Sequence, residues 1–134
     1  MIAYAIETDL SALEFQDVLR RSTLGERRPV DDLATLEAML RGASLTVTAR
    51  DQSGKLVGVS RSVTDFVYCC YLSDLCVDVG LQHQGIGKRL IEETRVQLRP
   101  GCSLILLAAP AANDYYPKIG FDKMDRCWWI PGKR

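Results

Sequence analysis

The sequence predicts one domain over residues 1–134, of the α/β (α+β) class, built on a mixed and mostly antiparallel sheet. Its 134 residues, 47% of them hydrophobic, match the size of a single domain with its own core. Apolar residues alternate in some segments, as in strands, and recur at helical spacing in others. In the second half, two apolar strand-like segments flank a helical one, which predicts a parallel pair joined by a crossover helix.

The first part of the chain predicts two helices after a short strand. Residues 3–7 can form an edge strand. Ser11 and Glu14 form an S-x-x-E capping box, which opens a helix whose apolar stripe contains Leu13, Phe15, Val18 and Leu19. Asp31 or Asp32 then caps a second helix, with an apolar face made of Leu33, Leu36 and Leu40.

A hairpin and a central strand follow these helices. Residues 45–50 and 56–63 alternate around the turn sequence Asp51-Gln52-Ser53-Gly54, which predicts two antiparallel strands. Residues 67–79 are largely apolar on both faces, as expected for a central strand that is covered on both sides. The sheet is therefore expected to be antiparallel in this region.

The last elements alternate again between helix and strand. Residues 85–98 have helical spacing, and the run SLILLAA at residues 103–109 predicts a buried strand parallel to the central one. A short helical turn and two closing strands should complete the fold. Trp128 and Trp129 lie in a late strand, where adjacent residues point to opposite sides, so one should be buried and the other exposed or shared in a homodimer.

Composition narrows the classes of function. Lys plus Arg and Asp plus Glu each number 17, so the formal charge is zero and nucleic acid is not an expected partner. There is neither an apolar run of roughly 18 residues nor a signal-like start, which predicts a cytoplasmic protein without a membrane partner. The five cysteines follow no C-x-x-C spacing and there is one histidine, so we expect reduced thiols and no metal site.

The segment between the central strand and the next helix is a candidate phosphate-binding loop. A helix N-terminus offers free N–H groups and the positive end of the helix dipole. Gly85 and Gly87 remove Cβ atoms that would hold a diphosphate away, and Lys88 adds a cation. A plain structural helix cap is the alternative interpretation. The candidate contacts in this loop are Gln82, His83, Gln84, Gly85, Ile86, Gly87 and Lys88.

Two common phosphate-binding motifs do not fit this loop. A dinucleotide-binding fingerprint would need glycine at position 90, where Leu90 stands. A P-loop would need glycine at position 82 and Ser or Thr at position 89, where Gln82 and Arg89 stand. Both classes are therefore excluded on the residues.

The loop instead resembles the signature Q/R-x-x-G-x-G/A of the GNAT superfamily of N-acetyltransferases, through Gln82, Gly85 and Gly87. Residues 72–78 and 103–109 resemble the fourth and fifth strands of that family. Further along, the sequence Tyr115-Tyr116-Pro117-Lys118-Ile119-Gly120-Phe121 resembles its motif (F/Y)-Y-x-K-x-G-F. The resemblance covers the C-terminal half, whereas the first 65 residues agree only in the order of elements.

This resemblance implies a GNAT-like sheet of about six to seven strands flanked by about four helices, with strands four and five splayed apart. It implies acetyl-CoA as the acyl-donor co-substrate. The pantetheine arm would enter the gap and pair with main-chain groups of Leu75, Cys76 and Val77. Asn113 is a further candidate contact for the cofactor.

Acetyl transfer to an amine needs a proton for the departing thiolate, and the resemblance assigns this role to Tyr116, which would also contact the cofactor. A phenol with a pKa near 10 is matched to a thiolate leaving group. Simple packing of Tyr116 against Tyr115 and Phe121 is the alternative. Pro117 departs from the family pattern, because it lacks an N–H and disfavours α conformation at the preceding residue, so the usual helix should begin late or bend.

The remaining catalytic roles have several candidates. The main-chain N–H of Cys76 could stabilise the oxyanion. For the base, Tyr71 stands where some family members carry Glu, and Asp74, on the opposite face of a regular strand, can act as base or accept structural hydrogen bonds. His83 lies in the phosphate loop, and a Cys76–His83 nucleophilic pair lacks a third residue to orient it.

The acceptor predicted by the resemblance is a primary amine of a small molecule or a peptide, which attacks directly in a ternary complex. An acyl-CoA-binding sensor or structural module without turnover is the alternative. The acceptor should enter near the first helices, where four arginines can favour an acidic acceptor or serve as solvated surface charge: Arg20, Arg21, Arg27 and Arg28.

Overall fold

The computed structural model describes residues 1–133, and within them one mixed sheet has five strands in the order β1-β2-β3-β4-β5. Neighbouring strands are antiparallel except for the parallel pair of β4 and β5. The predicted mixed sheet is confirmed, with fewer strands than the six to seven expected. The strands are β1 (Ala3–Ile6), β2 (Leu45–Arg50), β3 (Leu56–Thr64), β4 (Cys69–Val77) and β5 (Ser103–Ile105).

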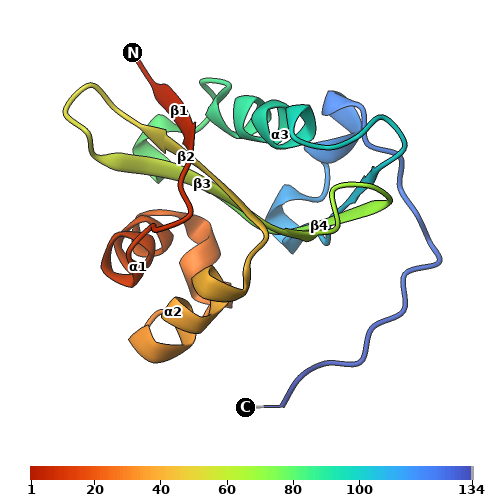
Figure 1. Ribbon diagram of the computed structural model, residues 1–134, viewed down its shortest axis with the longest axis horizontal. Coiled ribbons are helices and arrows are strands. Elements are labelled where there is room, and N and C mark those ends of the chain that lie inside the picture. The colour runs from red at the N-terminus through yellow and green to blue at the C-terminus, as the bar shows by residue number, and fades with distance from the viewer. Residues whose placement is uncertain (134) are drawn as a thin grey trace.

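Helices cover both faces of this sheet (Figure 1). Helices α1 (Ala12–Arg21) and α2 (Leu33–Gly42) lie on one face, and α3 (Ile86–Val96) lies on the other. These are the three α-helices of the described chain, one fewer than expected, and none has the length and hydrophobicity that a bilayer crossing requires. Four 3-10 turns join the elements: η1 (Thr23–Arg27), η2 (Val79–Leu81), η3 (Pro110–Ala112) and η4 (Tyr116–Ile119).

The predicted helix starts agree with the structure. The Ser11 hydroxyl accepts a hydrogen bond from the Glu14 N–H at 3.1 Å and caps α1. At α2 the second candidate aspartate, Asp32, is the cap and accepts from the Thr35 N–H at 3.0 Å. The predicted stripe of α1 was wrong at Leu13, which is 66% exposed, while the buried residues of the helix are Phe15, Val18 and Leu19.

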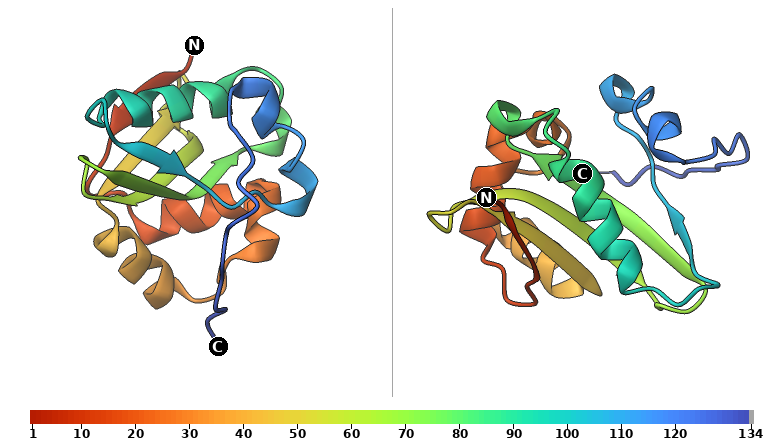
Figure 2. Two further views of the ribbon diagram at one scale, coloured as in Figure 1. Left: turned by 90° about the vertical axis from the view of Figure 1, so that its right-hand side faces the viewer. Right: turned by 90° about the horizontal axis from the view of Figure 1, so that it is seen from above.

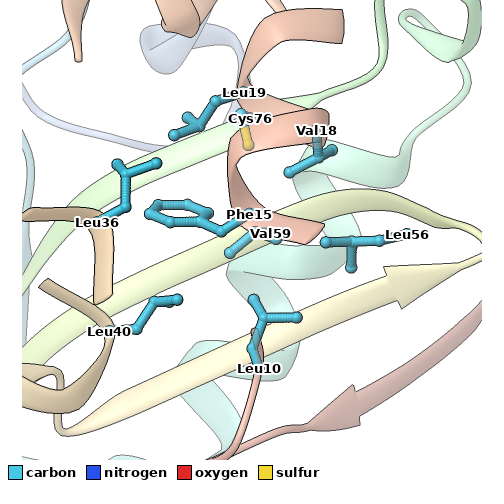
Figure 3. Packing of buried hydrophobic residues seen from close by; sticks show 9 residues of the cluster. All are labelled: Leu10, Phe15, Val18, Leu19, Leu36, Leu40, Leu56, Val59 and Cys76. Carbon is cyan, nitrogen blue, oxygen red and sulfur yellow. The ribbon is translucent and has the colours of Figure 1, made fainter. Parts of the chain in front are cut away.

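The core lies on both sides of the sheet. On the face of α1 and α2, Phe15 packs between Leu36 and the sheet residues Val59 and Cys76 (Figure 3). On the face of α3, a second cluster joins β2 and β3 to the helix through Val47, Val57, Ile86 and Leu90. Because burial of this kind contributes about 25 cal/mol per Å² of apolar surface, these clusters hold the helices against the sheet.

Strand β4 contains a bulge that the sequence did not indicate. Asp74 pairs with Arg61 of β3, whereas Tyr71 pairs with Val63, only two residues further along β3. Ser73 is the extra residue, so the strand is not regular between Tyr71 and Asp74. The register therefore puts both on the same face of the sheet, and the expectation of opposite faces was wrong.

Strands β4 and β5 separate after a short parallel pairing. Only Cys69 to Tyr71 pair with β5, through the last pair Tyr71 and Ile105. The predicted strand at residues 103–109 is thus three residues long, and it is not buried, because Ile105 and Leu107 are 54% and 51% exposed. Figure 2 shows the chain after β5 diverging from β4. The predicted splaying of these strands is present.

The end of the chain differs from the expectation. Within residues 1–133 no strand follows β5, and residues 122–133 form an exposed tail with a turn at residues 125–126 (Figure 1). Trp128 and Trp129 are 93% and 73% exposed, so neither is buried within one chain. A strand requires a neighbour with free main-chain groups, and the tail does not lie beside one in this chain.

Candidate functional site

The loop between η2 and α3 leaves main-chain donors unused. Gly85 is the N-cap of α3, with φ +85°, and no side chain caps the helix. The first bond across this turn runs from the Arg89 N–H to the Gly85 carbonyl at 3.0 Å. Among residues 1–133, no acceptor receives the N–H groups of residues 82–88. This end of α3 therefore offers a row of free donors and a positive dipole end to an anion.

The two glycines keep this row open to solvent. Gly85 is exposed, has a left-handed conformation, and a Cβ there would meet no other atom. A Cβ on Gly87 would lie 3.8 Å from the Tyr115 hydroxyl and 3.8 Å from a Val77 methyl. The protein itself could thus accommodate a side chain at Gly87, so glycine is useful there for the close approach of a ligand to the backbone.

The side chains of the loop have different surroundings. His83, Gln84 and Lys88 are exposed, whereas Ile86 is 3% exposed and packs in the core. Ile86 can therefore face a ligand only with its main-chain N–H and not with its side chain. The Gln82 side chain donates to the Val77 carbonyl at 3.3 Å and ties the loop to β4.

Charge near the loop also favours an anion. Within residues 1–133, Lys88 forms no ion pair, so its ammonium is available to a ligand. The neighbouring Arg89 is occupied, because its guanidinium contacts Glu93 at 2.8 Å and lies 4.8 Å from the centre of the Tyr4 ring. Lys88 is thus the free cation on the first turn of α3.

The free edge of β4 continues from this loop. The Asp78 N–H donates to the Val57 carbonyl at 2.9 Å, and Cys76 is paired with Val59. Since opposite residues in an antiparallel pair alternate between bonded and non-bonded pairs, Cys76 directs its main-chain groups toward β3. Leu75 and Val77 direct theirs toward the gap before β5. The expectation for Cys76, as cofactor contact and as oxyanion donor, is therefore corrected in favour of its neighbours.

The gap leads into a cavity between β4 and the chain after β5. Its walls are formed by residues of and next to the turn η1, of the bulged part of β4 and of the segment 107–116. The lining consists of Thr23, Leu24, Arg28, Leu72, Ser73, Leu75, Leu107, Ala109, Ala112 and Tyr116. The loop at α3 and this cavity lie at opposite ends of one open strand edge.

Tyr116 lies at this cavity on the turn η4. Its ring contacts Tyr115 and Phe121 edge to face, with ring centres 5.3 Å and 5.4 Å away. Burial raises the pKa of the Tyr116 phenol above its usual value, and the neighbouring Tyr115 raises it further. Pro117 follows in the first turn of η4, which is a 3-10 turn and not an α-helix, as its missing N–H predicts. The phenol therefore stays protonated at neutral pH beside the cavity.

Asp74 is buried in an ion-pair network. It is 0% exposed, and the Arg28 Nε contacts its Oδ1 at 2.6 Å while the Arg61 Nε donates to its Oδ2. Arg28 also donates to the Ser73 carbonyl at 2.8 Å, and Arg61 donates to the Met39 carbonyl at 3.1 Å. The network fastens the segment after η1 and the helix α2 to the bulge of β4.

The other predicted residues are not gathered in the cavity. Tyr71 is 40% exposed at the closed end of the gap, where β4 and β5 still pair. Asn113 is exposed at the end of η3. The Cys76 thiol is buried, and this burial raises its pKa to about 12, while His83 is exposed on the loop. These two residues form no catalytic pair.

Of the four predicted arginines, Arg28 alone lines the cavity. Arg20 pairs with Asp31 at 2.8 Å. Arg21 bridges Asp17 and Asp78, and Arg27 is exposed.

Sequence reasoning missed two features of the site. It gave no role to Arg61, whose charge is buried with Asp74, although an arginine within an otherwise uncharged strand is a signal for a buried acidic partner. It also named Tyr115 only as a packing partner of Tyr116, whereas the Tyr115 hydroxyl lies next to Gly87. No pattern in the sequence indicates this second contact, because residues 110–120 reach α3 only through the fold.

Comparison with known proteins agrees with this geometry. Residues 42–123, more than half of the chain, match the model of the acetyltransferase (GNAT) domain. The chain is 30% identical over 98 residues to a protein named GCN5-related N-acetyltransferase 2, chloroplastic, from Arabidopsis thaliana. That match covers 67% of this chain but 38% of the plant protein, so the chain spans well under half of that relative's length.

Solved structures share the fold. A probable acetyltransferase from Staphylococcus aureus superposes with a TM-score of 0.81 at 19% identity and covers 100% of both chains. A GNAT family N-acetyltransferase from Escherichia coli, solved in complex with CoA, has a TM-score of 0.69 at 20% identity, over 90% of this chain and 68% of that one. On the family model, and with the fold of these structures, the chain belongs to the GNAT acetyltransferase family.

Proposed function

We propose that the protein transfers an acetyl group from acetyl-CoA to a primary amine. The observation that carries this proposal is the row of unused N–H groups at residues 82–88, which leads along an open β4 edge to the Tyr116 cavity. A diphosphate fits the loop, and a slender arm with amide groups fits the edge. The CoA bound to the E. coli neighbour supports the same class of ligand.

The described residues offer a contact for each part of CoA. The N–H groups of residues 82–88 and the Lys88 ammonium would hold the diphosphate, and Tyr115 lies close enough to Gly87 to donate its hydroxyl. The free groups of Leu75 and Val77 would pair with the pantetheine arm. The thioester then lies in the cavity beside Tyr116.

The reaction follows from this placement. An unprotonated amine attacks the thioester carbonyl, so a C–N bond forms and the C–S bond breaks. An N–H of β4 that faces the gap, that of Leu75 or Val77, stabilises the oxyanion. The departing thiolate takes the proton of Tyr116, whose raised pKa keeps it protonated at neutral pH. The amine gives up its proton to solvent or to a base on the acceptor side.

Asp74 and Tyr71 are the two candidates for the base that takes the proton of the amine. Both carboxylate oxygens of Asp74 are engaged by guanidinium groups, one by Arg28 and the other by Arg61. Tyr71 shares a face with Asp74 but lies at the closed end of the gap. A positioning role for Asp74 agrees better with its contacts, because it fixes the cavity residue Arg28.

The engagement of Asp74 also favours a second candidate function, an acyl-CoA-binding module without turnover. Such a module needs the loop and the β4 edge but no base. The two functions differ in one readout, which is the release of free thiol from acetyl-CoA in the presence of amines. Small amines, polyamines, amino sugars and peptide N-termini form the acceptor panel.

The loop is tested by Gly85→Glu. A carboxylate at this position opposes the diphosphate by charge and bulk, so calorimetry should find CoA affinity reduced at least about 100-fold, near 2.7 kcal/mol. Gly54→Glu is the matched control, because Gly54 has φ +90° in an exposed turn where a Cβ meets no other atom. Unchanged CoA affinity in the Gly85 variant would contradict the loop assignment.

The proton donor is tested by Tyr116→Phe. The ring is kept, so CoA should bind as in the wild type, while kcat for thiol release falls about 100-fold because the thiolate loses its acid. Tyr115→Phe is the control, and it should change CoA affinity more than kcat. If Tyr116→Phe retains full kcat on every active amine, Tyr116 is not the acid.

A further inference from the structure

The cavity beside Tyr116 has one charged residue in its lining, which is Arg28. The other lining residues are apolar or bear a hydroxyl, as Leu107 and Thr23 do. Among residues 1–133 the wall therefore offers a cation and no carboxylate to a molecule that binds there. A few fixed polar groups in a largely apolar pocket determine which ligand fits, so this charge bears on the identity of the acceptor.

The ion pairs behind Arg28 leave one positive charge unbalanced. Arg28 and Arg61 both pair with Asp74, each through a different carboxylate oxygen, so within the described chain two guanidinium groups share one carboxylate and the cluster has a net charge of +1. Asp74 is 0% exposed and Arg61 is 7% exposed, whereas the side chain of Arg28 is 22% exposed. The unbalanced charge therefore faces the cavity through Arg28, where a bound anion would compensate it.

Arg28 also has N–H groups left to bind an anion. A guanidinium group carries five N–H donors in a planar fork. The Nε donates to Asp74 at 2.6 Å, Nη2 donates to the Ser73 carbonyl at 2.8 Å and Nη1 donates to the Arg27 carbonyl at 2.9 Å. The second N–H of each Nη has no acceptor among residues 1–133. Because three contacts already fix the plane of the fork, little further ordering is needed when it binds a ligand.

We propose that the acceptor is a free amino acid, whose carboxylate binds Arg28 while its amine faces the thioester beside Tyr116. This inference rests on the proposed acetyl transfer and specifies its acceptor. The cavity has a volume of about 80 Å³, which is room for roughly five to eight water-sized groups. Amine and anion must therefore lie only a few bonds apart, as they do in an amino acid. The single charge of a carboxylate also balances the net charge of the cluster, which a phosphate dianion would exceed.

The same charge rejects other amines. A polyamine or an amino sugar brings further ammonium groups, and these meet the excess positive charge of the Arg28 cluster without a lining carboxylate to pair with. A like charge placed in a site acts against the wrong ligand. A peptide N-terminus has an amide in place of the carboxylate, so it loses the charged contact with Arg28.

Matched acceptors test this assignment in the wild-type protein. Alanine, methionine and phenylalanine are each compared with their carboxamide and with the amine that lacks the carboxyl group, and free thiol released from acetyl-CoA is measured. We expect kcat/KM for the best amino acid to exceed that for its carboxamide at least about 10-fold, although the carboxamide keeps more of its amine unprotonated at neutral pH. Spermidine and O-phosphoethanolamine should be poorer still.

The possible failures are distinguishable. Thiol release that is faster with a carboxamide, a simple amine, spermidine or O-phosphoethanolamine contradicts the amino-acid acceptor but leaves acetyl transfer intact. The absence of thiol release with every acceptor contradicts acetyl transfer itself, and with it the assignment of the acceptor.

Variants of Arg28 locate the preference on this residue. Arg28→Gln leaves Arg61 and Asp74 as a balanced pair, so the ratio of kcat/KM for the amino acid to that for its carboxamide should fall to about 1, while kcat/KM for the carboxamide changes little. A purely structural role would lower both values together. Arg28→Lys keeps the charge without the fork and should retain part of the preference.

Arg27→Gln is the matched control, because Arg27 is the exposed neighbour and does not line the cavity. It should keep the wild-type ratio, and all three variants should bind CoA in calorimetry as the wild type does. An Arg28→Gln protein that binds CoA and still prefers the amino acid as the wild type does would show that Arg28 does not select the acceptor.

Discussion

Single residues on one face of a strand differ in chemistry according to what covers them. Cys76 and Cys69 belong to the same strand, yet Cys76 is buried against α1 and Cys69 is exposed. Burial disfavours the thiolate and raises the pKa of Cys76 to about 12. A thiol with this pKa cannot act as a nucleophile at neutral pH, which agrees with direct attack by the amine.

This contrast predicts how the cysteines react. At pH 8 a thiol with a pKa of about 12 is only about 10⁻⁴ thiolate, and the Cys76 side chain is also buried, whereas Cys69 is exposed. An alkylating reagent should therefore modify Cys69 at least about 1,000-fold faster than Cys76 in the folded protein, as followed by peptide mass spectrometry. In urea the two rates should converge. Rapid modification of Cys76 in the folded state would mean that the reagent reaches the face of β4 that α1 covers.

Residue-level prediction from sequence succeeded where the cause is local. The cap at Ser11 and the exposed glycine at position 85 depend on a few neighbouring residues, and both were recognised. The bulge at Ser73 depends on pairing with β3, so a regular pleat put Tyr71 on the wrong face. The direction of the Cys76 N–H likewise follows from strand pairing.

At the scale of elements, polar pairs fix how α3 sits on the sheet. The hydroxyls of Ser60 in β3 and Thr94 in α3 are 2.8 Å apart, and both residues are 0% exposed. The Thr94 hydroxyl also donates to the Leu90 carbonyl at 2.8 Å. A buried hydroxyl requires a partner, so this pair holds α3 in one register over β3, and with it the N-terminus next to the candidate phosphate-binding loop.

Thr94→Val tests this pair. The valine keeps the shape but leaves the Ser60 hydroxyl without its partner, which should lower the free energy of unfolding by about 1–3 kcal/mol in urea titrations. Adding Ser60→Ala should recover part of the loss, since no buried donor is then stranded. Thr94→Ser, which keeps the hydroxyl, is the control. A Thr94→Val protein as stable as the wild type would show that the Ser60–Thr94 hydrogen bond does not stabilise the fold.

Element-level prediction was accurate for the strands and helices with clear periodicity. The hairpin of β2 and β3, the crossover helix α3 and the parallel direction of β5 all follow from pattern and connection. The length of β5 could not be predicted from the pattern, because residues 106–109 are as apolar as residues 103–105. They leave the sheet because the chain turns toward η3, a property of the fold.

For the whole molecule, charge pairs join the start of the chain to the sheet. Arg50 of β2 contacts Glu7 after β1 at 2.8 Å and Glu14 of α1 at 2.6 Å. The hydrogen bond with Arg50 lowers the pKa of Glu7 below its usual value. A carboxyl with a lowered folded pKa stabilises the protein above its unfolded pKa, and this contribution is lost as the pH falls through the folded pKa.

The acid dependence can be measured with Glu7→Gln. At pH 6 the variant should unfold at lower urea concentration than the wild type, because Arg50 loses a charged partner. Below pH 4 the difference should shrink, since the wild-type carboxyl then takes up a proton. Glu37→Gln breaks an exposed pair with Arg41 and serves as control, with an effect below about 0.5 kcal/mol. A difference for Glu7→Gln that is independent of pH would contradict the linkage.

Whole-molecule prediction failed at the tail for a physical reason. The apolar residues near Trp128 have the composition of a strand, and sequence alone expected closing strands. A strand forms only beside a partner edge, and pattern does not tell whether that edge lies in the same molecule or in another. The exposed tail is the part of the chain for which intermolecular contacts must be considered.

The closed end of the gap between β4 and β5 fixes the length of the open edge of β4. From Val77 to Leu72 the open edge extends about 17 Å at roughly 3.3 Å per residue, and the Tyr71–Ile105 pair ends it. Under the proposed function, a linear ligand anchored at the α3 loop brings its thioester to Tyr116. An acyl chain longer than the space before that pair would collide with the joined strands, so the proposal predicts a preference for short acyl groups.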